Sequence, residues 1–237
     1  MRNIAIIPAR SGSKGLKDKN IKELCGKPLL AYSIATAKES GVFEHIMVST
    51  DSEVYASIAQ KWGAEVPFLR SEATSSDTAS TWDTVKEVLD NYALIGEKFD
   101  SVCVLQPTSP LRTAKDIVSG YELFHQKKAN AVVAVCEMEH SPLFSNTLPE
   151  DCCMDQFISQ EYFATPRQSL PVYYRINGAL YIVKESYLRK MDNLYQRKCY
   201  AYVMPRESSI DIDTEYDFMM TELILGRSVN KNKNFSQ

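Results

Sequence analysis

The sequence predicts an α/β protein: a doubly wound, mainly parallel sheet with helices on both faces, so that three layers pack in a Rossmann-like arrangement. Short apolar runs rich in β-branched residues alternate with longer amphipathic stretches, which is the pattern of successive βαβ units. The 237 residues are 44% hydrophobic and 24% charged, values that suit one large buried core. We therefore expect a single domain over residues 1–226, followed by a disordered polar tail at residues 227–237.

The N-terminal half of the chain alternates apolar runs with stretches in which apolar residues recur at helical spacing. The expected strands are residues 3–8, 45–49 and 65–69, and the expected helices are residues 28–40, 52–62 and 81–94. Pro28 suits the first turn of its helix and Gly41 suits the end of it, while Asp51 is the expected N-cap of the second helix. Polar loops are expected at residues 9–27 and 71–77.

The C-terminal half continues the same alternation but contains one long irregular segment. The expected strands are residues 101–105, 131–136, 178–183 and 200–204, and the expected helices are residues 113–126 and 215–225. The nearly all-apolar run 101–105 suits a central strand covered on both faces. Residues 137–171 lose periodicity and hold four prolines, so we expect a long functional excursion there.

Composition excludes several classes of function. The net charge of −3 argues against a nucleic-acid-binding protein, which usually carries a basic face. The six cysteines form no C-x-x-C pair, and the three histidines have no metal-ligand or triad spacing. No run approaches the roughly 20 apolar residues of a membrane span, and the first strand begins too early for a signal peptide. We expect a cytoplasmic protein that binds neither nucleic acid nor membrane.

The loop after the first expected strand has the composition of a polyphosphate-binding site. Ligands of open α/β sheets bind at the carboxyl ends of the strands, and residues 9–20 follow such an end. Glycines let backbone N–H groups approach phosphate oxygens, while Arg10, Lys14 and Lys19 can neutralise a triphosphate. The loop is neither a Walker motif nor a dinucleotide G-x-G-x-x-G fingerprint. A solvated turn is the alternative, but the position directly after a buried strand favours phosphate binding.

This loop and several later blocks resemble the cytidylyltransferases that activate acylneuraminates. The resemblance begins with Pro8-Ala9-Arg10-Ser11-Gly12-Ser13-Lys14-Gly15 and Lys19-Asn20. The further similar blocks are Ser49-Thr50-Asp51, Arg70 with Ser76-Asp77-Thr78-Ala79-Ser80, Gln106-Pro107-Thr108-Ser109-Pro110-Leu111-Arg112, Pro166-Arg167-Gln168, Arg175-Ile176-Asn177-Gly178 and Asp211-Ile212-Asp213. Ordered blocks over residues 4–217 are specific together, although each alone is weak.

The resemblance implies a nucleotide-diphospho-sugar transferase-like fold and assigns roles to individual residues. The implied CTP-binding residues are Ala9, Arg10, Ser11, Ser13, Lys14, Lys19, Asn20, Arg70, Ser80 and Thr81. The implied sugar-binding residues are Gln106, Arg167, Arg175, Asn177 and Tyr181, and the implied catalytic residues are Arg10, Lys19, Asp211 and Asp213. A guanidinium fork suits the carboxylate of an acidic sugar, although either sugar-side arginine could instead form a surface ion pair.

Asp211 and Asp213 also have a physical meaning of their own. Residues two apart in an extended segment point to the same side, so both carboxylates can face one hard cation. Mg²⁺ fits, with Mn²⁺ as an alternative, because it binds through one or two carboxylates plus waters and phosphates. The alternative is that Asp213 caps the last helix while Asp211 is exposed. The resemblance favours the metal pair.

The expected reaction transfers CMP from CTP to the anomeric hydroxyl of N-acetylneuraminate or a closely related nonulosonate and releases pyrophosphate. The proton acceptor stays open between Asp213 and a metal-bound hydroxide. Phe144 stands where some family members carry a lysine, so legionaminate, pseudaminate and 3-deoxy-manno-octulosonate are alternative substrates. A non-catalytic nucleotide-binding regulatory module is the alternative of another class. The resemblance further implies a homodimer, with residues 141–163 and 185–202 as dimerisation or sugar-site excursions.

Overall fold

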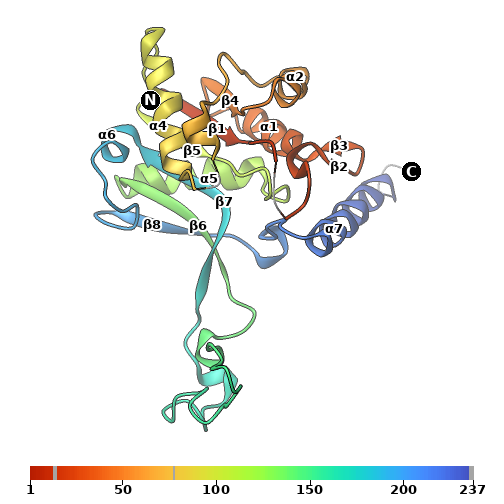
Figure 1. Cartoon of the computed structure of the whole chain (residues 1–237), viewed down its shortest axis with the longest axis vertical. Helices are drawn as coiled ribbons and strands as arrows, with labels where there is room; N and C mark the ends of the chain where they lie inside the picture. The colour runs from red at the N-terminus through yellow and green to blue at the C-terminus, as the bar shows by residue number, and fades with distance from the viewer. Residues whose placement is uncertain (13–14, 77, 235–237) are drawn as a thin grey trace.

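A six-stranded sheet forms the centre of the computed structural model, which describes residues 1–12, 15–76 and 78–234 (Figure 1). The strand order is β4-β1-β5-β7-β6-β8. The strands are β1 (Asn3–Pro8), β4 (His45–Ser49), β5 (Ser101–Val104), β6 (Ala131–Glu137), β7 (Tyr174–Lys184) and β8 (Cys199–Val203). Five run parallel, and β7 runs antiparallel between β5 and β6. The predicted mainly parallel sheet is confirmed.

Helices cover both faces of this sheet and produce the predicted three layers. One face packs on α1 (Leu29–Ser40), α2 (Glu53–Lys61) and α5 (Ala114–Gln126), and the other on α4 (Thr81–Leu94) and α6 (Glu185–Leu188). Alternation along β1 shows why: Ala5 and Ile7 enter the first core cluster, and Ile4 and Ile6 enter the second. All four side chains are fully buried, as expected for a strand covered on both faces.

Local sequence signals predict most helix ends correctly, but the N-cap of α2 is the residue after the predicted one. Pro28 is the N-cap of α1, and Thr113 begins α5 with a capping box completed by Asp116. The N-cap of α2 is Ser52, not the predicted Asp51, because the Asp51 carboxylate is used in a contact with a distant loop. The N-cap side chain of Ser52 accepts a hydrogen bond from the backbone N–H of Tyr55.

Three segments predicted as strand or loop differ in the structure. The expected strand 65–69 is reduced to a single bridge between Met47 and Glu65, because Pro67 cannot donate to a ladder. The expected loop 71–77 contains the short helix α3 (Glu72–Ser75). The expected loop 9–27 contains η1 (Lys19–Ile21) and the first strand of a two-stranded hairpin, β2 (Glu23–Leu24) with β3 (Lys27–Pro28).

Residues 138–173, here called the arm, leave the sheet after β6 and return at β7, extending away from the body (Figure 1). The arm holds the two turns η2 (Pro142–Phe144) and η3 (Arg167–Ser169). The predicted excursion 141–163 lies in it. Residues 185–202, predicted as a second excursion, instead pack on the body, where Leu188 and Leu194 are buried in the core. The burial of these two leucines in the core explains why this segment packs on the body and does not extend from it.

The C-terminal segment passes through η4 (Arg206–Ser208) into α7 (Glu215–Asn234). Helix was predicted to end at residue 225, with disorder beyond it. The helix continues because Gly226 alone costs only about 1 kcal/mol and no proline follows in residues 227–234. Residues 235–237 lie outside the described part. Within the part of the chain that the structure describes, no helix is long and apolar enough to cross a membrane.

Candidate active site

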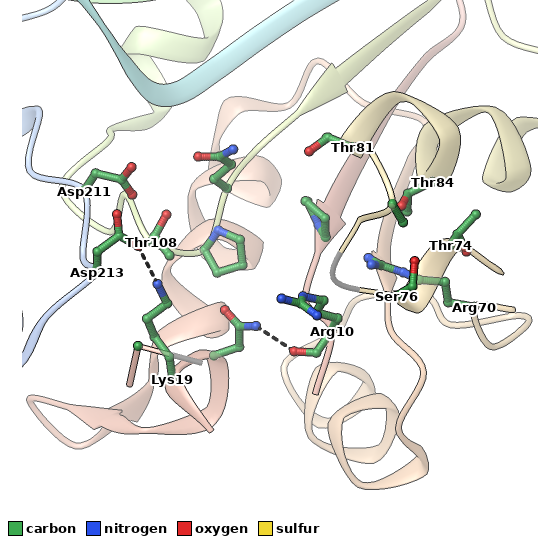
Figure 2. A pocket seen from close by; sticks show the side chains of 16 residues that line it. Arg10, Lys19, Arg70, Thr74, Ser76, Thr81, Thr84, Thr108, Asp211 and Asp213 are labelled. Carbon is green, nitrogen blue, oxygen red and sulfur yellow. Dashed lines mark hydrogen bonds and ion pairs between the residues drawn. The ribbon is translucent and has the colours of Figure 1, made fainter. Parts of the chain in front are cut away.

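A pocket of about 620 Å³ opens at the carboxyl edge of the sheet, where β1 and β5 end (Figure 2). The predicted site residues that line it are Arg10, Lys19, Asn20, Arg70, Thr81, Gln106, Asp211 and Asp213. The lining residues outside that prediction are Pro8, Gly15, Thr74, Ser76, Ala79, Thr84, Pro107 and Thr108. Residues of the segment 10–20 near the start of the chain and Asp211 and Asp213 near its end therefore share one cavity.

The basic loop after β1 and the acidic segment before α7 are in direct contact. The Lys19 ammonium donates to the Asp213 carboxylate at 2.9 Å and to the Ile212 carbonyl at 2.7 Å. Gly15 lies so close that a Cβ there would sit 2.9 Å from the Asp213 carbonyl oxygen, so the approach requires glycine. A second ion pair joins Lys22 to Glu215 just outside the pocket. The loop and the two aspartates thus lie together, as the resemblance implied by assigning them to one catalytic site.

Asp211 carries an unpaired carboxylate oxygen inside the pocket. Its Oδ1 is buried without a hydrogen-bond partner among the described groups. Burial, with a smaller contribution from the negative charge of Asp213, raises the pKa of Asp211 above its ordinary value. Figure 2 shows both carboxylates on one stretch of chain beside Thr108. A buried anionic oxygen without a donor is what a bound cation would satisfy, so the pair fits a divalent metal ion.

The donor set favours magnesium over a fully protein-held metal. Among the residues that the structure describes, no three His, Cys, Asp or Glu side chains gather as a metal cage. A metal on Asp211 and Asp213 would therefore take its other ligands from phosphate and water, as Mg²⁺ usually does. The alternative that Asp213 only caps α7 does not hold, because Thr214 accepts from the Asp217 N–H and Asp217 accepts from Thr214.

The phosphate-loop residues divide into those that face the pocket and those that brace the loop. Arg10 lines the pocket, and Asn20 both lines it and donates to the Arg10 carbonyl at 3.1 Å. Ala9 is buried, and its N–H donates to the Ser49 carbonyl. Ser11, predicted to contact the nucleotide, is not among the pocket-lining residues and donates from its N–H and hydroxyl to Asp51, each at 2.7 Å. Ser13 and Lys14, also predicted here, lie outside the described residues.

Asp51 is the bracing residue that sequence reasoning missed. Burial disfavours its charge, but the two hydrogen bonds from Ser11 lower the pKa of Asp51 below its ordinary value. It therefore stays ionised and holds the start of the loop. Its place after β4, in a block similar to the family, was the available signal; helix-capping propensity competed with it.

The far wall of the pocket is rich in hydroxyl groups. Arg70 donates from Nε to the Ser49 hydroxyl at 3.1 Å and from Nη2 to the Ser49 carbonyl at 2.9 Å. Thr81 lines the pocket as predicted, but the Ser80 hydroxyl accepts from the Asp83 N–H as the N-cap of α4. The hydroxyl residues missed by the prediction are Thr74, Ser76 and Thr84 on this wall and Thr108 beside the two aspartates. The serine- and threonine-rich run 71–81 was the signal for the first two.

Of the four predicted sugar-binding residues whose side chains the structure describes, only Gln106 lines this pocket. Asn177 is buried and donates to the Ser209 hydroxyl at 2.9 Å, and Arg175 donates to the Ser209 carbonyl at 3.1 Å. Tyr181 packs edge-on against Trp82, and burial raises the pKa of Tyr181 to about 12. Arg167 belongs to η3 in the arm, and its side chain lies outside the described part.

The fold and this cavity define a class: a nucleotidyltransferase-like α/β protein in which a basic loop and a carboxylate pair meet at the sheet edge. Residues 4–234 match the family model described as cytidylyltransferase. The chain belongs to the cytidylyltransferase family.

The chain is similar to known cytidylyltransferases over most of its length. It is 38% identical to an N-acylneuraminate cytidylyltransferase of Escherichia coli over 97% of this chain, but spans only 53% of that longer protein. It is 36% identical to a CMP-N,N'-diacetyllegionaminic acid synthase of Legionella pneumophila, covering 95% of this chain and 97% of the relative. A solved CMP:2-keto-3-deoxy-manno-octonic acid synthetase complexed with CTP superimposes with a TM-score of 0.73 at 14% identity, covering 96% and 100% of the two chains. That structure shows a shared fold.

Proposed function

We propose that this protein transfers CMP from CTP to the anomeric hydroxyl of a nonulosonate, N-acetylneuraminate or a close relative, and releases pyrophosphate. The observation that carries the proposal is the contact between the basic loop and the carboxylate pair: Lys19 donates to Asp213, two residues from Asp211 and its unpaired oxygen. Family membership and the names of the relatives support the nucleotide and the sugar class.

The chain's own residues suit an in-line displacement at the α-phosphorus. Arg10 and Lys19 bind the β- and γ-phosphates, where their charges stabilise the departing pyrophosphate. Asp211 and Asp213 would hold Mg²⁺, which when bound supplies positive charge to the α-phosphate. The bond from the sugar oxygen to phosphorus forms as the bond from phosphorus to the pyrophosphate oxygen breaks. The Asp213 carboxylate is the proposed acceptor of the hydroxyl proton.

The arginine that binds the sugar carboxylate comes from a second copy of the chain in this proposal. Arg175, the predicted sugar arginine of the body, donates to the Ser209 carbonyl. Arg167 lies in the arm, which extends away from the body that holds the pocket (Figure 1). The arm also exposes Phe163 at 80% and Val172 at 58%, apolar surface that a partner would cover. A homodimer in which each arm reaches the other pocket accounts for both features.

A substrate panel tests the reaction and the sugar together. The protein is incubated with CTP, Mg²⁺ and each of N-acetylneuraminate, legionaminate, pseudaminate and 3-deoxy-manno-octulosonate, and pyrophosphate release is measured. Phe144 in place of a lysine removes a charge from the arm, so we expect kcat/KM to differ among the nine-carbon sugars. If none of the four sugars supports the release of pyrophosphate, the proposal is rejected and a nucleotide-binding module without catalysis is favoured.

A further inference from the structure

Strand β7 changes register where it passes the pocket. It pairs with β6 through Tyr181 and Val133 on one side of the change and through Ile176 and Val135 on the other. Residues 177–180 of β7 therefore stand opposite the single residue Ala134. Such a bulge re-aims the backbone and its side chains, and bulges are frequent beside active sites.

Buried polar side chains fix this bulge. The Asn177 carboxamide accepts from the Ala179 N–H at 3.1 Å and donates to the Ser209 hydroxyl at 2.9 Å. Arg112, 2% exposed, donates from Nη1 to the Ala179 carbonyl at 2.6 Å. Losing a buried hydrogen bond leaves its partner unsatisfied, at a cost of about 1–3 kcal/mol. The backbone at the bulge is therefore held in one conformation.

Gly178, at the centre of the bulge, faces two side chains of the pocket. Its φ of +76° lies in the left-handed region. A Cβ on Gly178 would come under 3.0 Å from the Gln106 Oε1 and would stand 3.4 Å from the Asp211 Oδ2. The first contact is one that real side chains do not make, and the second is an ordinary van der Waals contact. The space beside Gly178 is thus filled by the Gln106 amide.

The main chain of Gln106 cannot easily move aside. Its carbonyl accepts from the Ser33 hydroxyl at 3.3 Å, and Ser33 in turn accepts from Arg112 Nη2 at 2.6 Å. A larger residue at position 178 would therefore displace the Gln106 side chain and leave its backbone in place.

The geometry points to Gly178 as a positioning residue for Gln106: the missing Cβ leaves the space in which the bulge of β7 seats the Gln106 amide beside Asp211. The effect of Gly178 on sugar use rests on the proposed function, in which Gln106 is a predicted sugar-binding residue that lines the pocket. The effect of Gly178 on the position of the Gln106 amide does not depend on the proposed function.

A double-mutant cycle tests this role. Gly178→Ala, Gln106→Ala and the double variant are compared with the wild type by kcat/KM for the sugar at saturating CTP and Mg²⁺. We expect Gly178→Ala to lower kcat/KM roughly tenfold in the wild-type background and by less than about twofold when Gln106 is already alanine. An equal loss in both backgrounds, or unchanged kinetics in the single variant, would overturn the proposal.

A matched glycine separates backbone strain from the effect on Gln106. Gly41 has a φ of +65° and nothing within 4 Å of a Cβ, at the C-terminus of α1. Gly41→Ala should lower Tm as Gly178→Ala does, because both place alanine in the left-handed region, but should leave kcat/KM unchanged. A kinetic loss in Gly41→Ala as large as in Gly178→Ala would assign the effect to general strain.

A readout without turnover keeps this test independent of the proposed reaction. The side-chain amide signal of Gln106 in a ¹H–¹⁵N NMR spectrum is identified by its absence in Gln106→Ala. We expect that signal to shift in Gly178→Ala and to stay in place in Gly41→Ala. A wild type that uses none of the sugars would reject the proposed function, whereas an unmoved Gln106 signal in Gly178→Ala would reject the positioning role.

Discussion

The pocket at the sheet edge and the arm of residues 138–173 are held in opposite ways. Around the pocket, distant segments are joined by buried groups, such as Arg112 to the Ala179 carbonyl and Asn177 to Ser209. In the arm, no residue whose exposure is described is buried. A segment without buried apolar side chains gains little stability from its own packing. The comparison teaches that buried contacts within one chain preform the pocket, whereas the arm leaves exposed the apolar side chains that the proposed dimer would cover.

The strongest test of the preformed half is Asp211→Asn. We expect it to lower kcat by several orders of magnitude, because the carboxylate proposed to hold Mg²⁺, whose Oδ1 is buried and unpaired among the described groups, loses its charge. Pyrophosphate release measures the loss, and Mn²⁺ binding followed by electron paramagnetic resonance measures the metal site directly. Asp192→Asn, at an exposed position outside the pocket, is the control. Near-normal turnover in Asp211→Asn would refute the metal assignment.

Lys19→Met tests whether the contact between the two ends of the chain serves the triphosphate. We expect kcat/KM for CTP to fall on the order of 100-fold. The variant lacks the largely buried Lys19 ammonium, which is proposed to stabilise the leaving pyrophosphate. The matched control is Lys22→Met, which removes the neighbouring ion pair to Glu215 without changing the pocket lining. Equal losses in the two variants would mean that the contact only holds α7 in place.

Phe163→Asp tests the dependence of the arm on a partner. Phe163 is 80% exposed, and a charge there should weaken association of the arm with the partner chain and raise the KM for the sugar roughly tenfold, with the KM for CTP nearly unchanged. Analytical ultracentrifugation gives the oligomeric state. Leu94→Asp, at an 84% exposed position of α4 in the body, should leave both properties unchanged. A wild type that sediments as a monomer would remove the basis of the comparison.

The smallest expected effect is on the Tm, and it arises because the preformed site buries the ionised Asp211 carboxylate. The pKa of Asp211 is raised in the folded protein, so its ionised form is favoured in the unfolded chain. The protonated Asp211 carboxyl therefore adds to the free energy of unfolding below the ordinary aspartate pKa of about 4. This contribution is lost as the pH rises through the raised pKa of the folded protein. At pH 7 without metal, Asp211→Asn should therefore raise Tm by about 2–4 °C, and the difference should shrink at acid pH. A lower Tm at every pH would contradict this reading.

The sequence predicted the sheet, its helical layers and the identity of the pocket's main charges. Runs such as residues 4–7 and 102–105 are apolar, and a basic loop directly after a strand lies at the carboxyl end of that strand. It did not predict that Asn177 and Arg175 would bond to Ser209, because block resemblance does not say which way a side chain turns. Nor did it predict that Asp51 would hold Ser11, since capping propensity is a local signal.

Periodicity and composition, which depend on near neighbours in the chain, determined the layered α/β architecture and placed the loop of Arg10 and Lys19 after the first strand. Block resemblance and the two-residue spacing singled out Asp211 and Asp213. Only the tertiary structure decided that Lys19 meets Asp213, 194 positions away, that β7 inserts antiparallel between β5 and β6, and that Gly178 leaves room for Gln106. The physical reason is that local patterns fix which face of an element is buried, whereas contacts between elements depend on register, bulges and long-range packing.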